Sequence, residues 1–253
     1  MQIINLKTID SVATYVADIL IQSIHEFQPT EQKPFLVLGL PTGSTPIPVY
    51  QQLVQAYQQG IISFKHVVTF NMDEYVGLAP EHKQSYHYFM QEHLFQHIDI
   101  PQNQIYILNG MALDLETECT EYEKKIASFG GIDIQLGGIG ENGHLAFNEP
   151  QTPFTSLTHV QQLTQNTIEV NSRFFDSLSD VPTQALTIGL QTIFNAKQII
   201  IMATGNKKHN AVQTVSSGQL SINCPATLLN NHNNAIIVCD ETAYPQNQRV
   251  LIP

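Results

Sequence analysis

The sequence predicts an α/β fold: a single doubly wound, mostly parallel sheet with helices on both faces, similar to a modified Rossmann fold. Two patterns favour this fold, namely short apolar runs typical of buried strands and amphipathic stretches at helical spacing that alternate with them. A third observation is that no internal repeat or linker divides the chain. We therefore expect residues 1–253 to form one domain, whose 42% hydrophobic content suffices for a large core.

The expected elements follow in order along the chain. Residues 9–27 carry apolar side chains at helical spacing, whereas FLVLGL (35–40) is a continuous apolar run typical of a buried parallel strand. The same patterns and the positions of proline and glycine predict further helices at 48–60, 85–98 and 115–131, strands at 65–78 (running into a loop), 104–108 and 132–140, and continued alternation through 182–196, 198–204, 207–218 and 234–240.

Parallel sheets of this kind bind their ligands outside the carboxyl ends of the strands. The search for functional residues can therefore concentrate on the loops that follow predicted strands. These loops are 41–46, 71–78, 138–150 and 205–208.

The segment LGGIGENGHLAFNEP (136–150) contains Gly138, Gly140 and Gly143 in G-x-G-x-x-G spacing. In a dinucleotide-binding loop such glycines open a helix, and an acidic residue ends the next strand. Here Pro150 leaves little room for a helix, and no strand with an acidic end follows at the right distance. The context argues against a nicotinamide or flavin site, and we expect no cofactor.

The same segment brings several polar side chains close together after a predicted strand. Glu141, Asn142, His144 and Glu149 lie within nine residues. A carboxylate can fix the tautomer of an imidazole and increase its basicity, so one interpretation is a proton-transfer site. The other is a polar loop with a structural histidine, and the sequence alone leaves both open.

The segment FLVLGLPTGSTPIPVY (35–50) predicts a strand, a turn and the start of a helix. Thr42, Gly43, Ser44 and Thr45 could bind an anion through backbone N–H groups and hydroxyls at the positive end of that helix. The segment lacks the G-K-[ST] ending of a P-loop, so ATP is not expected. An ordinary turn with a helix cap remains the alternative.

Asp73 and Glu74 follow the apolar part of the 65–78 strand. Neighbouring side chains at a strand end point in different directions, so at most one of them is expected to face a ligand. A carboxylate there could act as a general base, and the alternative is a cap or a surface turn.

The charge balance narrows the class of partner. The formal net charge is −11, with only 11 Lys and Arg residues, which argues against nucleic acid and anionic membranes as partners. No signal peptide or membrane-spanning window is apparent, so a cytoplasmic protein is expected. Four histidines lie within residues 82–97, namely His82, His87, His93 and His97. The last two are spaced as two metal ligands on one helix would be, but no third ligand is evident. A solvated helix face is therefore favoured, and no metal is expected.

Taken together, LGLPTGSTP, TFNMDEYVGL, SYHYFM, GGIGENGHLAFNEP and NSRFFD, in this order, resemble the glucosamine-6-phosphate deaminase family. The resemblance runs from about residue 35 to beyond residue 208. It implies conversion of glucosamine 6-phosphate to fructose 6-phosphate and ammonia, without metal or organic cofactor. The superfamily also includes 6-phosphogluconolactonases and sugar-phosphate-sensing domains, so a sister activity on the same scaffold and a non-catalytic sensor are the alternatives.

The resemblance also implies roles for individual residues. Asp73 matches the group that takes the C2 proton, His144 the group that opens the sugar ring, and Glu149 the carboxylate that orients this histidine. The phosphate would bind to the 42–45 turn. Two cations would assist it, Arg173 and Lys208.

The chain departs from the family pattern at two places. Asn142 stands where many members have Asp, so the relay through His144 would depend more on Glu149, and ring opening is the step placed in doubt. Longer, hexameric relatives activated by N-acetylglucosamine 6-phosphate carry basic residues after the N-E-P element, whereas this chain has His159 and Gln161. We therefore expect this compound to activate the protein weakly or not at all. The sequence leaves open whether the protein forms a homo-oligomer. The 150–182 loop is the candidate for a lid over the site.

Overall fold

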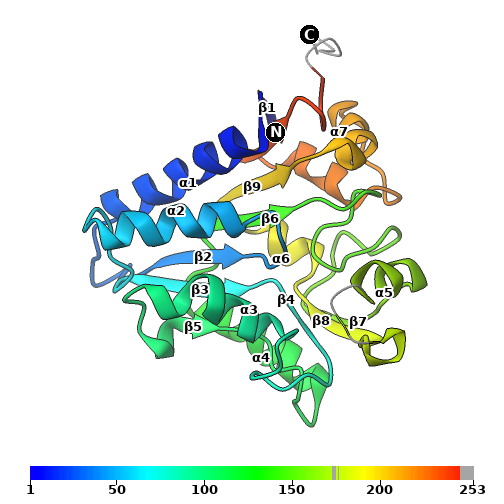
Figure 1. Ribbon diagram of the computed structural model, residues 1–253. Coiled ribbons are helices and arrows are strands. Elements are labelled where there is room, and N and C mark those ends of the chain that lie inside the picture. The colour runs from blue at the N-terminus through cyan, green and yellow to red at the C-terminus, as the bar shows by residue number, and fades with distance from the viewer. Residues whose placement is uncertain (173–174, 176, 246–253) are drawn as a thin grey trace.

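The computed structural model describes residues 1–172, 175 and 177–245, and it is built around a central parallel sheet. Within these residues seven strands lie in the order β1-β10-β9-β6-β2-β3-β5, and every neighbouring pair is parallel (Figure 1). The strands are β1 (Gln2–Leu6), β2 (Leu36–Leu40), β3 (Val67–Asn71), β5 (Ile105–Tyr106), β6 (Ile134–Gly138), β9 (Gln198–Ala203) and β10 (Ala235–Asp240).

Helices cover both faces of this sheet, as the sequence predicted. Because side chains alternate along a strand, Leu38 and Leu40 of β2 pack into the core under α1 and α2, whereas Val37 belongs to the core on the opposite face. Figure 1 shows α1 and α2 side by side along one face. The first face carries α1 (Ile9–Glu26), α2 (Ile47–Gln58) and α3 (Tyr86–His93), and the second carries α4 (Leu115–Ser128), α6 (Leu190–Phe194) and α7 (His209–Ser216).

The chain reverses its direction of travel across the sheet between β2 and β6. From β2 it continues through α2 to β3 on one side, and from β6 it continues to β9 on the other side. The loops that leave these two adjacent strands therefore diverge, and a crevice opens between them at the carboxyl edge of the sheet. This crevice is where a ligand is expected in such a fold.

A second, antiparallel sheet lies beside the carboxyl edge, with strand order β4-β8-β7. Its strands are β4 (Asp73–Tyr75), β7 (His159–Gln162) and β8 (Gln184–Thr187). The sequence predicted one strand over 65–78, but the structure divides it at Met72, whose N–H donates to Leu40 and whose carbonyl accepts from Ile188. Met72 thus carries the chain from the large sheet into the small one.

Three further segments differ from the sequence prediction. Residues 2–6 form the edge strand β1, which was not predicted. The helix expected over 85–98 ends at His93, because Leu94 leaves helical geometry with φ −141° and ψ −63°. The segment 150–182, expected as a loop, contains β7 and the short helix α5 (Gln165–Asn171). None of the helices in the described part of the chain has the length and apolar content needed to cross a membrane.

Candidate active site

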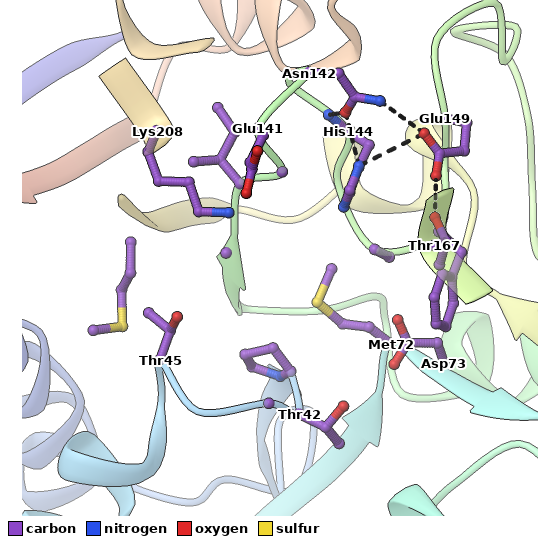
Figure 2. A pocket seen from close by; sticks show the side chains of 18 of the residues that line it. Thr42, Thr45, Met72, Asp73, Glu141, Asn142, His144, Glu149, Thr167 and Lys208 are labelled. Atoms are coloured by element: carbon purple, nitrogen blue, oxygen red, sulfur yellow. Dashed lines mark hydrogen bonds and ion pairs between the residues drawn. The ribbon is translucent and has the colours of Figure 1, made fainter. Parts of the chain in front are cut away.

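The crevice between β2 and β6 contains a cavity of about 710 Å³ (Figure 2). Segments far apart in the sequence supply its walls: the turn after β2, the residues around β4, the loop after β6, α5 and the 3₁₀ turn before α7. The cavity lining includes most of the polar residues singled out from the sequence, together with one glycine of the turn: Thr42, Gly43, Thr45, Asp73, Glu141, Asn142, His144, Glu149 and Lys208.

Asp73 begins β4 and points into the cavity, although the residue is only 8% exposed. Burial disfavours the charged form of a carboxyl group, and the adjacent Glu74 adds like-charge repulsion. Together they raise the pKa of Asp73 to about 8. A carboxylate in this environment is a stronger base than a solvated one, as proton abstraction from carbon requires.

Glu74 points away from Asp73, and it caps a helix. Its carboxylate accepts hydrogen bonds of 2.9 Å from the backbone N–H groups of Tyr86 and His87 at the start of α3 and from that of Tyr75 in β4. Burial raises the pKa of Glu74 to about 7, and these three hydrogen bonds oppose the rise. The expectation that the two carboxylates face different ways thus agrees with the structure.

The loop after β6 carries His144 on a backbone shaped by two glycines. The imidazole ring packs against Gly140 so closely that a Cβ at that position would overlap it. Gly143 adopts a positive φ of 84°, which L-residues rarely adopt, and a side chain there would strike the sulfur of Cys224. No helix follows these glycines, so the loop lacks the geometry of a dinucleotide site.

His144 is held in one tautomer by the amide of Asn142. The amide oxygen lies 2.8 Å from Nδ1 of His144, and the amide nitrogen donates to Glu149 over 2.9 Å. Since an amide oxygen only accepts, Nδ1 carries the proton and Nε2 is left as an acceptor. Burial lowers the pKa of His144, with Glu149 opposing the shift, so the neutral ring is favoured.

Glu149 acts on His144 by its charge and by hydrogen bonds that pass through Asn142. Its Oε2 is 3.7 Å from Nδ1 of His144, beyond hydrogen-bond distance, and its Oε1 accepts a 2.9 Å hydrogen bond from the hydroxyl of Thr167 on α5. The family resemblance implied that Glu149 orients this histidine. In the structure the hydrogen bonds between the two side chains run through Asn142.

The opposite end of the cavity is suited to an anion. Thr42, Gly43 and Thr45 lie in the turn before α2, whereas Ser44 of the same turn is exposed and does not line the cavity. Lys208 projects toward the cavity from the far side (Figure 2), and burial lowers the pKa of its amine. The second cation suggested by the resemblance, Arg173, lies outside the described residues.

Two of the four histidines considered as metal ligands, His93 and His97, lie in different helical elements. His93 ends α3, and His97 lies in the following 3₁₀ turn with its Nε2 2.9 Å from the carbonyl of Glu92. Within the described ranges, no group of three or more His, Cys, Asp or Glu side chains is arranged to hold a metal ion.

The structure adds cavity residues that the sequence analysis did not single out. They include Met72, Tyr86, Thr167 and Lys207. Tyr86 and Thr167 reach the cavity from helices, and the search was confined to loops after strands. Lys207 was adjacent to an expected cation, and its amine lies 3.3 Å from the carboxylate of Glu141.

The chain is similar to known proteins along most of its length. A family model described as glucosamine-6-phosphate isomerases/6-phosphogluconolactonase matches residues 7–238. A glucosamine-6-phosphate deaminase of Porphyromonas gingivalis is 51% identical over 244 residues, covering 96% of this chain and 92% of the relative. One of Treponema denticola is 50% identical, with coverage of 96% and 90%.

Solved structures agree with these matches. A structure described as a monomeric glucosamine-6-phosphate deaminase superposes with a TM-score of 0.90 at 41% identity, covering 96% of this chain and 98% of the other. A 6-phosphogluconolactonase of Trypanosoma cruzi shares the fold, with a TM-score of 0.74 at 18% identity and coverage of 96% and 95%. The chain therefore belongs to the family of glucosamine-6-phosphate isomerases and 6-phosphogluconolactonases.

Proposed function

We propose that this protein converts glucosamine 6-phosphate and water to fructose 6-phosphate and ammonia. The observation that carries the proposal is a single cavity in which a buried carboxyl group, an imidazole with an accepting Nε2 and a lysine-bearing anion site lie together. Relatives at about 50% identity are named as glucosamine-6-phosphate deaminases, which supports the same reaction.

In this proposal the substrate phosphate binds at the end of the cavity near α2. Backbone N–H groups and hydroxyls of Thr42, Gly43 and Thr45 would donate to it at the positive end of the helix dipole. Lys208 would supply a positive charge, and Arg173 is proposed as a second cation from the family resemblance alone. The sugar ring would then extend toward His144 and Asp73.

Ring opening is assigned to His144. A pyranose opens when the C1 hydroxyl loses its proton and the ring oxygen O5 gains one, so one group must accept a proton and return it nearby. The unprotonated Nε2 of a neutral imidazole can accept from O1 and then donate to O5. The hydrogen bond from Nδ1 to Asn142 stabilises the required tautomer and orientation.

Deamination is assigned to Asp73. Its carboxylate takes the C2 proton from the open-chain aldehyde, and the electron pair forms the C1–C2 double bond of an enolate bearing the amine. Asp73 then returns this proton to C1 while one proton of the amine moves to O1, which gives an imine at C2. Water hydrolyses the imine to the ketone with release of ammonia. The atoms balance with one water consumed, and a positioned base of this kind typically contributes ~10²–10⁴ in rate.

The test is coupled detection of fructose 6-phosphate and ammonia from glucosamine 6-phosphate with the purified protein. Equal amounts of both products are expected, with turnover reduced ~10²-fold or more in Asp73→Asn while substrate binding is retained. 6-Phosphogluconolactone is the comparison substrate. Turnover of the lactone together with inert glucosamine 6-phosphate would overturn the proposal.

A further inference from the structure

A continuous row of hydrogen bonds joins α5 to the imidazole of His144 (Figure 2). The hydroxyl of Thr167 donates to Oε1 of Glu149 over 2.9 Å, and Oε2 of Glu149 accepts from the Asn142 amide over 2.9 Å. The amide oxygen accepts from Nδ1 of His144 over 2.8 Å. Thr167 is the member of this row that comes from outside the loop after β6.

The direction of each hydrogen bond in the row is fixed. A carboxylate oxygen accepts hydrogen bonds, so the Thr167 hydroxyl must donate its single proton to Glu149. The hydroxyl of Thr164 lies 2.9 Å from that of Thr167 and must therefore donate to it, while accepting from the Thr167 backbone N–H over 3.2 Å. The N-terminal cap of α5 thus holds the Thr167 hydroxyl toward Glu149.

The place of Thr167 depends on the docking of α5. This helix spans seven residues, too few to be stable in isolation. Its Ile168 packs against a small apolar cluster formed by Tyr75, Phe147, Leu163 and Ala185. Tyr75 belongs to β4, the strand that carries Asp73, so the same contacts connect α5 to both halves of the site.

We propose that Thr167 is a positioning residue for the reaction, and the inference rests on the function proposed above. By holding Oε1 of Glu149, it keeps Oε2 directed at Asn142 and thereby keeps His144 in the tautomer and orientation that ring opening needs. The proton relay is therefore complete only when α5 is docked. Thr167 acts through Glu149 and lies away from the phosphate site proposed beside Thr42 and Lys208 (Figure 2).

The first test removes the hydroxyl and keeps the shape. Thr167→Val should lower kcat about 10-fold with KM changed less than about 2-fold, because the lost contact supports a catalytic group. Thr167→Ser keeps the hydroxyl and should retain most of the activity. Gln165→Ala is the matched control on α5, since it removes the exposed contact with Glu169 and should leave kcat unchanged. Thr167→Ala is a second hydroxyl deletion, in case the valine variant folds poorly.

The second test asks whether Thr167 acts through Glu149. In a Glu149→Gln background the further change Thr167→Val should cost less than about 2-fold in kcat, because the group that it positions is already impaired. An equal loss in both backgrounds, or full activity of both hydroxyl deletions, would overturn the inference. Absence of activity in the unmodified protein would instead overturn the proposed function, so the two failures are distinguishable.

Discussion

At the scale of single residues, two adjacent carboxyl groups are buried at the wall of the cavity. Asp73 and Glu74 are adjacent, 8% and 3% exposed, and burial raises the pKa of both carboxyl groups. Glu74 is compensated by three backbone N–H groups, whereas Asp73 faces the cavity. A buried base of this kind serves the reaction and reduces the stability of the fold.

We therefore expect Asp73→Asn to stabilise the folded protein in a pH-dependent way. Because the pKa of Asp73 is about 8 in the folded protein and near its ordinary value of 3.8 in the unfolded chain, folding favours the protonated form. The stability of the native protein is then complete below pH 4 and falls as the pH rises through 8. Asparagine has no such titration, so the free energy of unfolding of the variant should exceed that of the native protein by about 2 kcal/mol or more at pH 8 and by little at pH 4.

The measurement is urea unfolding of both proteins between pH 4 and 8.5. Asp114→Asn is the control with the opposite sign, because the hydrogen bonds from Thr117 lower the pKa of this exposed helix cap. Its charged form favours folding and its pKa lies below 3.8, so that variant should lose nearly the same amount of stability across the whole of this pH range. A gain for Asp73→Asn that is constant with pH would show that titration is not the cause.

Asn142 offers a second prediction at this scale. Asn142→Asp places a carboxylate at the position of the amide, 2.8 Å from Nδ1 of His144, and a negative charge there should raise the pKa of the imidazole. Since ring opening needs the unprotonated Nε2, the acidic limb of kcat/KM should move to higher pH, by about 1 unit. A pH–rate profile measures this shift. An unchanged acidic limb would show that protonation of His144 does not cause it.

At the scale of elements, the active site depends on contacts that hold the small sheet and α6 against α4. Glu123 of α4 supplies a single carboxylate oxygen that accepts from the backbone N–H and hydroxyl of Thr158 and from the hydroxyl of Thr192, at 2.8, 2.5 and 2.6 Å. Thr158 immediately precedes β7, and Thr192 lies in α6. One side chain thus joins three elements behind the cavity.

Glu123→Ala should lower the free energy of unfolding by about 1–3 kcal/mol, because it leaves buried donors without their acceptor. Urea unfolding measures the change. Glu121→Ala on the same helix is the matched control: it removes only an exposed ion pair with Lys124 and should cost less than about 1 kcal/mol. Equal effects of the two variants would contradict the structural role of Glu123.

At the scale of the whole molecule, a net charge of −11 must be reconciled with an anionic substrate. The long-range field opposes the approach of a phosphate, so binding depends on local donors at helix ends and on the lysines of the 3₁₀ turn Asn206–Lys208. Both lysines of that turn line the cavity, but Lys207 is paired with Glu141, whereas Lys208 projects toward the cavity (Figure 2).

Regulation is also a property of the whole molecule. The positions where longer relatives are expected to carry basic residues hold His159 and Gln161, whose side chains lie 3.3 Å apart on β7. The rate should therefore depend hyperbolically on substrate concentration, with or without N-acetylglucosamine 6-phosphate. Initial rates measured with and without this compound test the prediction, which a sigmoidal curve made hyperbolic by it would contradict.

Much of this architecture could be predicted from local sequence patterns. Apolar runs such as residues 35–40 and the helical spacing of 9–27 depend on neighbours in the chain, so strand β2 and helix α1 appear close to where they were expected. The edge strand β1 was not predicted, because it is partly exposed and lacks a continuous apolar run. The end of the helix at His93 was missed because none of the next seven residues is a glycine or a proline.

The sequence by itself determined the α/β class, the family resemblance and the segments of the chain that carry Asp73, His144 and Lys208. Only the tertiary structure decided the division of the 65–78 strand at Met72, the position of Asn142 between Glu149 and His144, and the contact of Thr167 with the relay. The physical reason is the separation along the sequence of the residues that interact. Strand and helix patterns arise from residues a few positions apart, whereas the relay joins side chains whose distances are set by the packing of α5 and the small sheet against the large one.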